Sequence, residues 1–279
     1  DMTNPLAILA FLMFISGLSF KISLVPFHFW TADVYEGAPT NVTSYLSVIS
    51  KGAAVFIFNI LLFTVFRNIV DVWSDILYAL AILTMTIGNL FAIRQTNIKR
   101  FLAFSSVAQA GFILLGLLGT NELGMATVVY FILIYIFSNL AAFGVIAAIE
   151  AKTNKVNIDD YNGLYKKNPN MSLLMMLALF SLAGIPPLAG FFAKFYVFKS
   201  VIEQSMYFLA IVGLLSTVIA AFYYLRIIKV IYFDKEKESY DTDHNIWLKG
   251  SLTFSTLLIL LYFIFPGKLV EIVSRINII

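Results

Sequence analysis

The sequence predicts an all-α integral membrane protein of about eight transmembrane helices. Hydrophobic residues make up 60% of the chain and charged residues only 13%, whereas soluble domains carry roughly 25% charge. The mean hydropathy is +0.88. About eight apolar stretches are long enough to cross the hydrocarbon layer, which is about 30 Å thick, as helices that rise about 1.5 Å per residue. A soluble fold could not bury this much apolar surface.

The apolar stretches follow one another along the chain and define the expected helices. They run near residues 5–30, 41–66, 73–93, 98–118, 123–149, 171–198, 207–233 and 248–265. Residues 151–170 and 234–245 form longer loops, for which a solvated hinge or cap is the favoured interpretation. We interpret residues 1–279 as a single transmembrane domain that is partial, with upstream helices missing.

The cations are distributed unevenly between the two ends of the predicted helices. Twelve Lys and Arg residues lie at the ends of the third, fifth and seventh helices or in the loops that follow them, and four lie at the opposite ends: Arg67, Lys199, Lys268 and Arg275. Cytoplasmic or organelle-matrix loops carry the excess of Lys and Arg. We therefore expect the C-terminus on the outer side of the membrane.

Composition also excludes several classes of function. The net charge of +3 is too small to indicate nucleic-acid binding, so the expected partner is lipid. The sequence has no cysteine, which excludes disulfides, iron–sulfur ligation and zinc thiolate sites in this chain. The chain opens with Asp1, and no short basic region precedes the first apolar run. We expect no signal peptide, and we expect the chain to be a fragment.

Two of the apolar stretches contain helix-breaking residues in their interiors. In FKISLVPFHFW, Pro26 follows Lys21, and in LAGIPPLAGFFAKF a Gly- and Pro-rich run precedes Lys194. We expect both helices to break at membrane depth, where non-helical backbone is tolerated only inside protein or along a watery cavity. The two stretches cross in opposite directions, which is typical of an inverted repeat built around a transport path.

Three lysines lie well inside apolar stretches: Lys21, Lys51 and Lys194. Each costs about 2.5–3.5 kcal/mol at a helix centre. Burial withdraws solvation from the charged form, so such a lysine can release and rebind a proton near neutral pH. Snorkelling of the ammonium to the interface is the alternative, and it fits Lys51 poorly. The pattern favours proton transfer.

The lysines have no acidic partner at mid-membrane depth in this sequence. Asp33 and Glu36 lie at the far end of the first interrupted stretch, and Glu150 ends the fifth stretch. A buried lysine normally has a carboxylate nearby that tunes it. We interpret the missing acid as a sign that part of the site is contributed by residues outside this chain.

Weaker candidates accompany the lysines. His28, in PFHFW, ionises near neutral pH and is a candidate relay, although packing among aromatic rings explains it equally well. Ser105 and Gln109 lie four residues apart on one helix, beside Ser106, and are candidates for ordering water. Polar contact between helices is an equal alternative for them. The Phe-rich stretches favour packing or lipid contact over a quinone pocket.

Five motifs in order resemble the antiporter-like membrane subunits of NADH:quinone oxidoreductase, respiratory complex I. They are FKISLVPFHFWTADVYEGAPT, SKGAAVF, NIKRFLAFSSVAQAGF, LAGIPPLAGFFAKFYVF and YYLRIIKVIYF. The wider family includes Mrp-type cation/proton antiporter subunits and membrane subunits of related hydrogenases. PFHFW followed by DVYEGAPT is most similar to the subunit N family.

The resemblance implies a fourteen-helix fold with two inverted five-helix repeats, of which this chain supplies the last eight helices. It implies that Lys21 pairs with a glutamate on an upstream helix, that Lys51 is the central relay, and that Lys194 serves the outward side. Many relatives have His where this chain has Gln109, which cannot titrate, so only water ordering is expected there.

The function implied is a proton-translocating subunit of NADH:quinone oxidoreductase, in a bacterial inner or an organelle inner membrane. This chain would hold no cofactor, because NADH, FMN, iron–sulfur clusters and quinone would bind to partner subunits. An Mrp-type antiporter subunit is the alternative within transport. A membrane anchor, whose lysines only hold neighbouring helices, is the alternative from another class.

Overall fold

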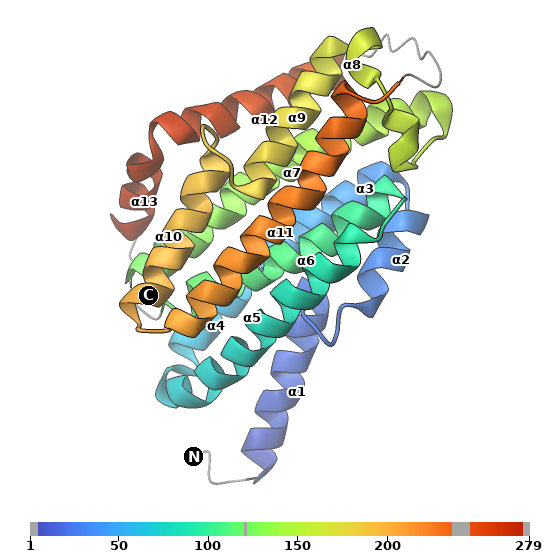
Figure 1. The fold of residues 1–279 in the computed structure, drawn as a ribbon. Helices are drawn as coiled ribbons and strands as arrows, with labels where there is room; N and C mark the ends of the chain where they lie inside the picture. The colour runs from blue at the N-terminus through green and yellow to red at the C-terminus, as the bar shows by residue number, and fades with distance from the viewer. Residues whose placement is uncertain (1–4, 120–121, 236–245, 276–279) are drawn as a thin grey trace.

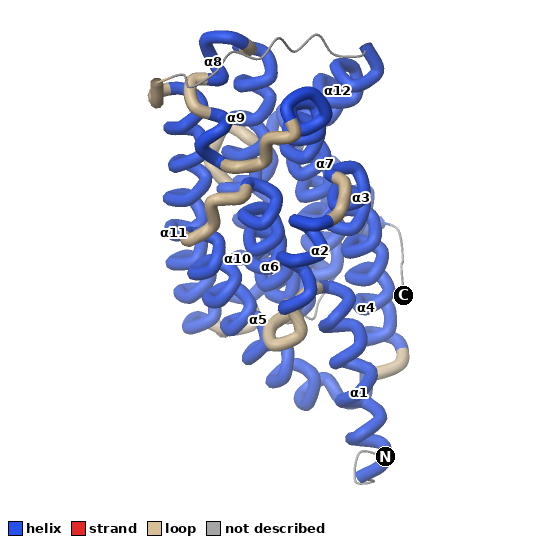
Figure 2. Tube along the Cα trace, turned by 90° about the vertical axis from the view of Figure 1, so that its right-hand side faces the viewer, coloured by secondary structure: helices blue, strands red, loops and turns tan. Residues whose placement is uncertain are grey.

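The computed structural model describes residues 5–119, 122–235 and 246–275 and is a bundle of long helices (Figure 1). The helices are α1 Pro5–Ile22, α2 Phe29–Gly37, α3 Thr40–Tyr45, η1 Leu46–Ser50, α4 Lys51–Thr64, η2 Arg67–Ile69, α5 Val70–Ile93, α6 Ile98–Leu117, α7 Glu122–Thr153, η3 Ile158–Tyr161, α8 Leu164–Lys167, α9 Pro169–Ala183, α10 Ala189–Glu203, α11 Tyr207–Tyr232, α12 Ile246–Ile264 and α13 Pro266–Arg275. Among the described residues, β pairing is confined to an isolated bridge between Asn97 and Asn157. The predicted all-helical class is confirmed (Figure 2).

In the described part of the chain, six helices are long and apolar enough to cross a membrane. They are Pro5–Ile22, Thr40–Thr64, Arg67–Ile93, Ile98–Leu117, Ala126–Thr153 and Tyr207–Tyr232. Two further apolar helices, Pro169–Ala183 and Lys249–Ile264, are shorter. The predicted stretches 98–118 and 207–233 agree with α6 and α11 to within one residue. The integral membrane character is therefore supported.

Helix α6 lies at the centre of the bundle. Every residue of α6 except Arg100 is buried, including polar Ser105, Ser106 and Gln109. Asn97 caps the start of α6, because its side chain accepts hydrogen bonds from the backbone N–H groups of Lys99 and Arg100. The surrounding helices therefore pack against polar as well as apolar positions of α6.

The first interruption separates α1 from α2. Helix α1 ends at Ile22, and helix resumes only at Phe29 after the turn that contains Pro26. In the turn, the Val25 N–H donates to the Thr84 hydroxyl of α5 at 3.1 Å. A side chain of a neighbouring helix therefore satisfies one of the backbone groups that the interruption leaves free.

The second interruption separates α9 from α10 and depends on two glycines. Gly184 ends α9 with φ +82°, the left-handed conformation that glycine adopts without a Cβ clash, and its N–H bonds back to the Phe180 carbonyl at 3.0 Å. At Gly190 the backbone of α10 approaches α9 so closely that a Cβ would lie 1.7 Å from the Ser181 carbonyl oxygen. Glycine thus allows the two half-helices to meet.

The predicted cation-rich loops lie at one end of the bundle. The turns after α5 and α7 and the end of α11 lie at the upper end in Figure 1, and the turns after α4 and α10 lie at the lower end. Backbone hydrogen bonds tie two of the upper loops together, from Ile98 N to Val156 O at 2.8 Å and from Ile158 N to Thr96 O at 2.7 Å. Most of the predicted polar loop 234–245 lies outside the described residues.

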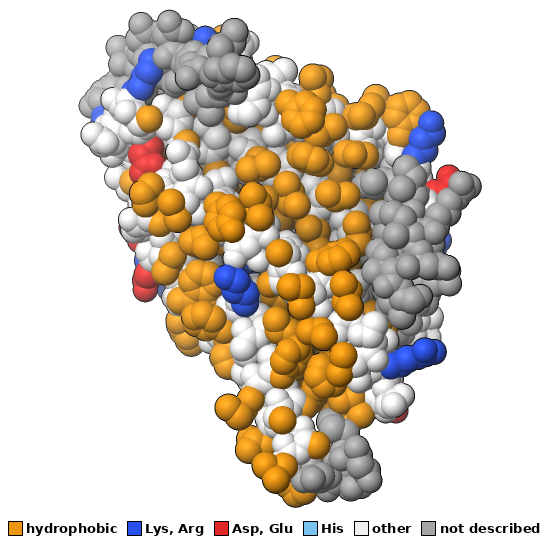
Figure 3. Space-filling model, turned by 180° about the vertical axis from the view of Figure 1, so that it is seen from behind, with side chains coloured by type: hydrophobic (Ala, Val, Ile, Leu, Met, Phe, Trp, Pro, Cys, Tyr) orange, Lys and Arg blue, Asp and Glu red, His pale blue; other side chains and the backbone are white. Residues whose placement is uncertain are grey.

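The surface of the molecule is largely apolar. The back of the molecule is covered by hydrophobic side chains (Figure 3), as expected of a protein that contacts lipid or other membrane subunits.

Helix α13 was not predicted from the sequence, because it is too short and too charged to resemble a membrane crossing. Its signal was Pro266 at the first helical position, which favours helix initiation.

Candidate proton-transfer site

Lys51 is buried at the junction of a π-helical turn and a regular helix. It is the first residue of α4, directly after η1, and only 2% of the residue is exposed. Its Nζ donates to the main-chain oxygen of Ser106 at 3.1 Å and to the Ser106 hydroxyl at 2.5 Å. The ammonium group therefore contacts α6 at the middle of the bundle.

Lys194 is buried on α10 beside the second interruption. It is 4% exposed, and its Nζ donates to the carbonyl oxygen of Ala183, the last residue of α9, at 2.9 Å. The same nitrogen lies 4.6 Å from the centre of the Phe112 ring of α6, in the range of a cation–π contact. The interruption thus provides both an acceptor and space for the lysine.

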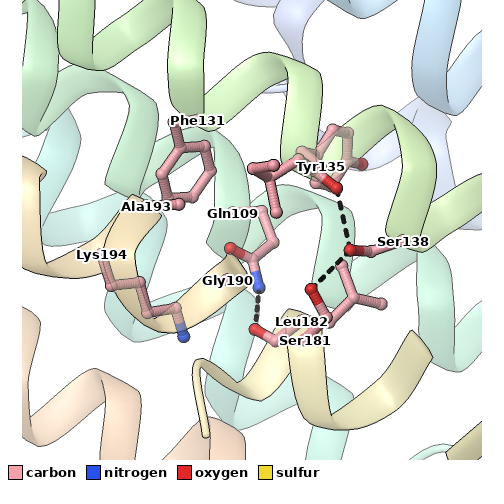
Figure 4. A pocket seen from close by; sticks show the side chains of 10 residues that line it. Gln109, Phe131, Tyr135, Ser138, Ser181, Leu182, Gly190, Ala193 and Lys194 are labelled. Atoms are coloured by element: carbon pink, nitrogen blue, oxygen red, sulfur yellow. Dashed lines mark hydrogen bonds between the residues drawn. The ribbon is translucent and has the colours of Figure 1, made fainter. Parts of the chain in front are cut away.

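Gln109 lies three residues along α6 from Ser106, the residue that Lys51 contacts, and lines a small cavity with Lys194 (Figure 4). Its Nε2 donates to the Leu182 carbonyl at 2.9 Å. The cavity has a volume of about 10 Å³, close to the smallest volume that admits one water molecule. Ser138 of α7 and Ser181 of α9 also line it, and their hydroxyls hydrogen-bond to each other at 2.8 Å.

Ser105 is also buried, but its hydroxyl faces α11. It forms a short hydrogen bond with the hydroxyl of Tyr224, which also lies within interaction range of Gln109. On the other side of α6, the Tyr135 hydroxyl hydrogen-bonds to Ser47 at 3.0 Å and lies near Ser106. The two tyrosines place hydroxyls on both flanks of the central helix.

These groups form a polar seam, a row of neighbouring buried polar side chains, through the apolar core. On α6, Ser106 and Gln109 are three residues apart and share a face. Ser106, which accepts from Lys51, therefore lies about one helical turn from Gln109, which lines the cavity beside Lys194. Sequence reasoning missed the members of the seam on other helices: Ser47, Tyr135, Ser138, Ser181 and Tyr224. Tyr135 and Ser138 had a signal, because two polar residues three apart on a membrane helix share a face.

The structure does not bring Lys21 into this seam. Lys21 lies in the last turn of α1 and is exposed. His28 is 4% exposed and lies in the turn after α1, with its ring 4.6 Å from that of Phe29. The His28 Nδ1 is buried and makes no hydrogen bond to a described residue. The roles expected of both residues stay predictions.

A second cluster of charged side chains lies at the cation-rich end. Arg100 donates to Asp33 at 2.6 Å and to Glu36 at 2.8 Å, joining α6 to α2. Lys99 donates to Glu150 of α7 at 3.0 Å. Across the described residues there is no group of three His, Cys, Asp or Glu side chains able to hold a metal ion.

Comparison with known proteins decides the family. The family model for the transmembrane part of NADH:quinone oxidoreductases and Mrp antiporters matches residues 2–220. The chain belongs to this family. Most of the polar seam, including Lys51 and Lys194, lies within the matched residues.

Within the family, the chain is similar to proteins named NADH-quinone oxidoreductase subunit N. It is 62% identical to that of Pelagibacter ubique over 94% of this chain and 56% of the relative. It is 54% identical to that of Azobacteroides pseudotrichonymphae over 85% of this chain and 49% of the relative. The chain thus spans about half the length of the curated relatives it matches.

Solved structures show the same fold. A chain of respiratory complex I from Thermus thermophilus superposes with a TM-score of 0.77 at 30% identity, over 91% of this chain and 56% of the other. A chain of the Mrp complex from Dietzia superposes with a TM-score of 0.84 at 21% identity, over 92% of this chain and 56% of the other. At that lower identity the Mrp likeness shows the fold alone.

Proposed function

We propose that this chain forms the second half of a proton-translocating membrane subunit of an NADH:quinone oxidoreductase, similar to subunit N. The observation that carries the proposal is the buried polar seam, which holds Lys51 and Lys194 in contact with neighbouring helices. The names and the identity of the relatives support it.

The proposed architecture has eight membrane crossings in a single, partial transmembrane domain. Helices α1 and α2 together form one broken crossing, and α9 and α10 form another, as in an inverted-repeat transporter of fourteen helices. Exposed Lys21 then faces the remainder of the subunit, where a glutamate on an upstream helix pairs with it. The length of the relatives, about twice that matched by this chain, supports this arrangement.

In the proposed mechanism, protons move along the seam between the lysines. Ser106 accepts from charged Lys51, and Ala183 together with the Phe112 ring stabilises charged Lys194. A charge at one lysine disfavours a charge at the next, because like charges repel strongly where water is excluded. Gln109 and the serine hydroxyls order water and do not carry a net charge themselves.

The energy for translocation would come from partner subunits. NADH oxidation at FMN, electron transfer through iron–sulfur clusters and quinone reduction would take place there, and the coupling would reach this chain as a change in charge or conformation. Its partners are the other membrane subunits and the lipid bilayer, with no nucleic acid. The cation-rich end would face the cytoplasm or organelle matrix, with the C-terminus on the outer side of the inner membrane.

Two lysines of α10 provide a matched test. Lys194 is buried in the seam, whereas the Lys199 side chain is 51% exposed. In inverted membrane vesicles that contain the assembled enzyme, Lys194→Met should abolish most proton pumping, and Lys199→Met should leave it unchanged. Pumping that survives Lys194→Met at the parent rate, with assembly verified, would exclude the seam as the path. Copurification without flavin and iron–sulfur subunits would favour an Mrp-type antiporter instead.

A further inference from the structure

A surface cavity lies at the cation-rich end, beside the helix that carries Lys51. Its volume is about 290 Å³, and its lining comes from the start of α3 and the end of α7, including Pro39, Thr40, Ala147 and Glu150. The cavity is large enough for several water molecules. Glu150 is the acidic residue of its lining.

Glu150 connects this cavity to the interior through a hydroxyl. Its carboxylate accepts a short hydrogen bond from Thr40, which is 4% exposed. It also accepts from Lys99, which holds the carboxylate in place and itself donates to the Ala38 carbonyl at 2.9 Å. A carboxylate in this position can accept a proton from water in the cavity and pass it on, which is the role of a general acid or base.

From Thr40 a stripe of buried polar residues leads along one helix to Lys51. Thr43 and Ser47 are fully buried, and Lys51 follows at the same spacing of four residues. A spacing of four slightly exceeds the 3.6 residues of an α-helical turn. The π-helical turn η1, closed by i to i+5 bonds, takes up this excess between Ser47 and Lys51. The polar side chains therefore stay on the inner face.

Tyr35 of α2 lies near both Ser47 of the stripe and Ser106, the residue that accepts from Lys51. Its side chain is buried, and its hydroxyl makes no hydrogen bond of normal geometry to a described residue. That hydroxyl lies within interaction range of both Ser47 and Ser106. Since Ser106 accepts from Lys51 Nζ, a hydroxyl and water chain can run from Ser47 through Tyr35 and Ser106 to the lysine.

We propose that Glu150 and its cavity are the proton entrance to Lys51, with Thr40, Thr43, Ser47 and Tyr35 lining the route. The inference rests on the proposed function, because it assigns the supply of protons to the lysine relay. Thr40 lies eleven residues before Lys51 in a nearly continuous helix, about 16 Å away along its axis at about 1.5 Å per residue. The route thus extends from one end of the helix to about the middle of the membrane.

The test compares variants of the assembled enzyme in inverted vesicles, measuring proton pumping and NADH oxidation together. Glu150→Gln removes the proton-binding group while keeping an acceptor for Lys99 and Thr40. We expect it to lose pumping to the same extent as Lys51→Met, and Glu150→Asp to restore it. Glu36→Gln is the matched control, because Glu36 is a carboxylate at the same end that lies outside the cavity, and Arg100 retains Asp33. It should pump like the parent.

The outcomes separate the two proposals. Parent-like pumping in Glu150→Gln, together with lost pumping in Lys51→Met, would overturn the entrance and leave the proposed function intact. Parent-like pumping in Lys51→Met would overturn the proposed function, and the entrance with it.

Should Glu150→Gln fail to assemble, Ala147→Cys decides. A bulky, positively charged thiol reagent bound in the cavity should then block pumping, while the same reagent on exposed Tyr165→Cys should not. Parent enzyme treated with the reagent controls for cysteines of other subunits. Unimpaired pumping in labelled Ala147→Cys would refute the entrance.

Discussion

Replacing Lys51 with Met separates a transport role from a structural one. Lys51 is 2% exposed and donates to Ser106 twice. Removing a lysine from the helix centre relieves about 2.5–3.5 kcal/mol on insertion scales. Loss of its hydrogen bonds, with a buried hydroxyl left unpaired, costs about 1–3 kcal/mol. The free energy of unfolding should therefore change by no more than about 2.5 kcal/mol, and in most of that range it increases.

The transport effect of the same change should be much larger. Met cannot bind a proton, and a positioned acid or base contributes about a hundredfold or more to a proton-transfer step. The assay pairs proton pumping with thermal denaturation of the purified enzyme. Lys51→Met combined with Ser106→Ala should be more stable than Lys51→Met alone, because the unpaired Ser106 hydroxyl is removed together with the ammonium. A drop of more than about 3 kcal/mol in unfolding free energy for Lys51→Met, with pumping retained in the fraction that stays folded, would refute the relay and favour the membrane-anchor interpretation.

Three further predictions follow from the packing and the topology. Gly190→Ala should destabilise the protein by about 1–3 kcal/mol and impair pumping, because a Cβ would lie 1.7 Å from the Ser181 carbonyl oxygen. Gly250→Ala is the control: a Cβ added there would have no neighbouring atom within 4 Å, so the melting temperature should stay the same or rise. A cysteine at Asn170 should react with a membrane-impermeant reagent only from the cytoplasmic or matrix side, and one at Ser205 only from the outer side, so the reverse labelling would overturn the orientation. The chain reconstituted alone should conduct no more protons than empty vesicles, since the proposed path needs the rest of the subunit; a flux that vanishes in Lys51→Met or Lys194→Met would contradict this.

The fold class followed from the sequence because membrane insertion is governed by segment length and hydropathy. The predicted stretch 98–118 agrees with α6, and stretch 207–233 agrees with α11, because each is a continuous apolar run bounded by polar residues. Helix α13 escaped this reasoning since it is short and amphipathic. Orientation relative to the membrane and the pairing expected of Lys21 stay predictions.

The sequence was less informative about the candidate site. It identified Lys51 and Lys194, because a lysine among apolar residues stands out along the chain. It could not identify Ser47, Ser181 or Tyr224, since single hydroxyl residues are frequent in membrane helices and serve packing as often as function. Their significance depends on which helix face they occupy and on what lies opposite.

By itself, then, the sequence determined the membrane class, the positions of the long helices and the two lysines whose burial needs an explanation, because these depend on local hydropathy. Only the tertiary structure decided which side chains meet. Ser106 becomes the ligand of Lys51 because α6 packs centrally, and Ala183 becomes that of Lys194 because the chain breaks after it. Glu150 reaches Thr40 across 110 residues of sequence. Such contacts depend on how helices distant in sequence pack, and hydropathy along the chain carries no record of that packing.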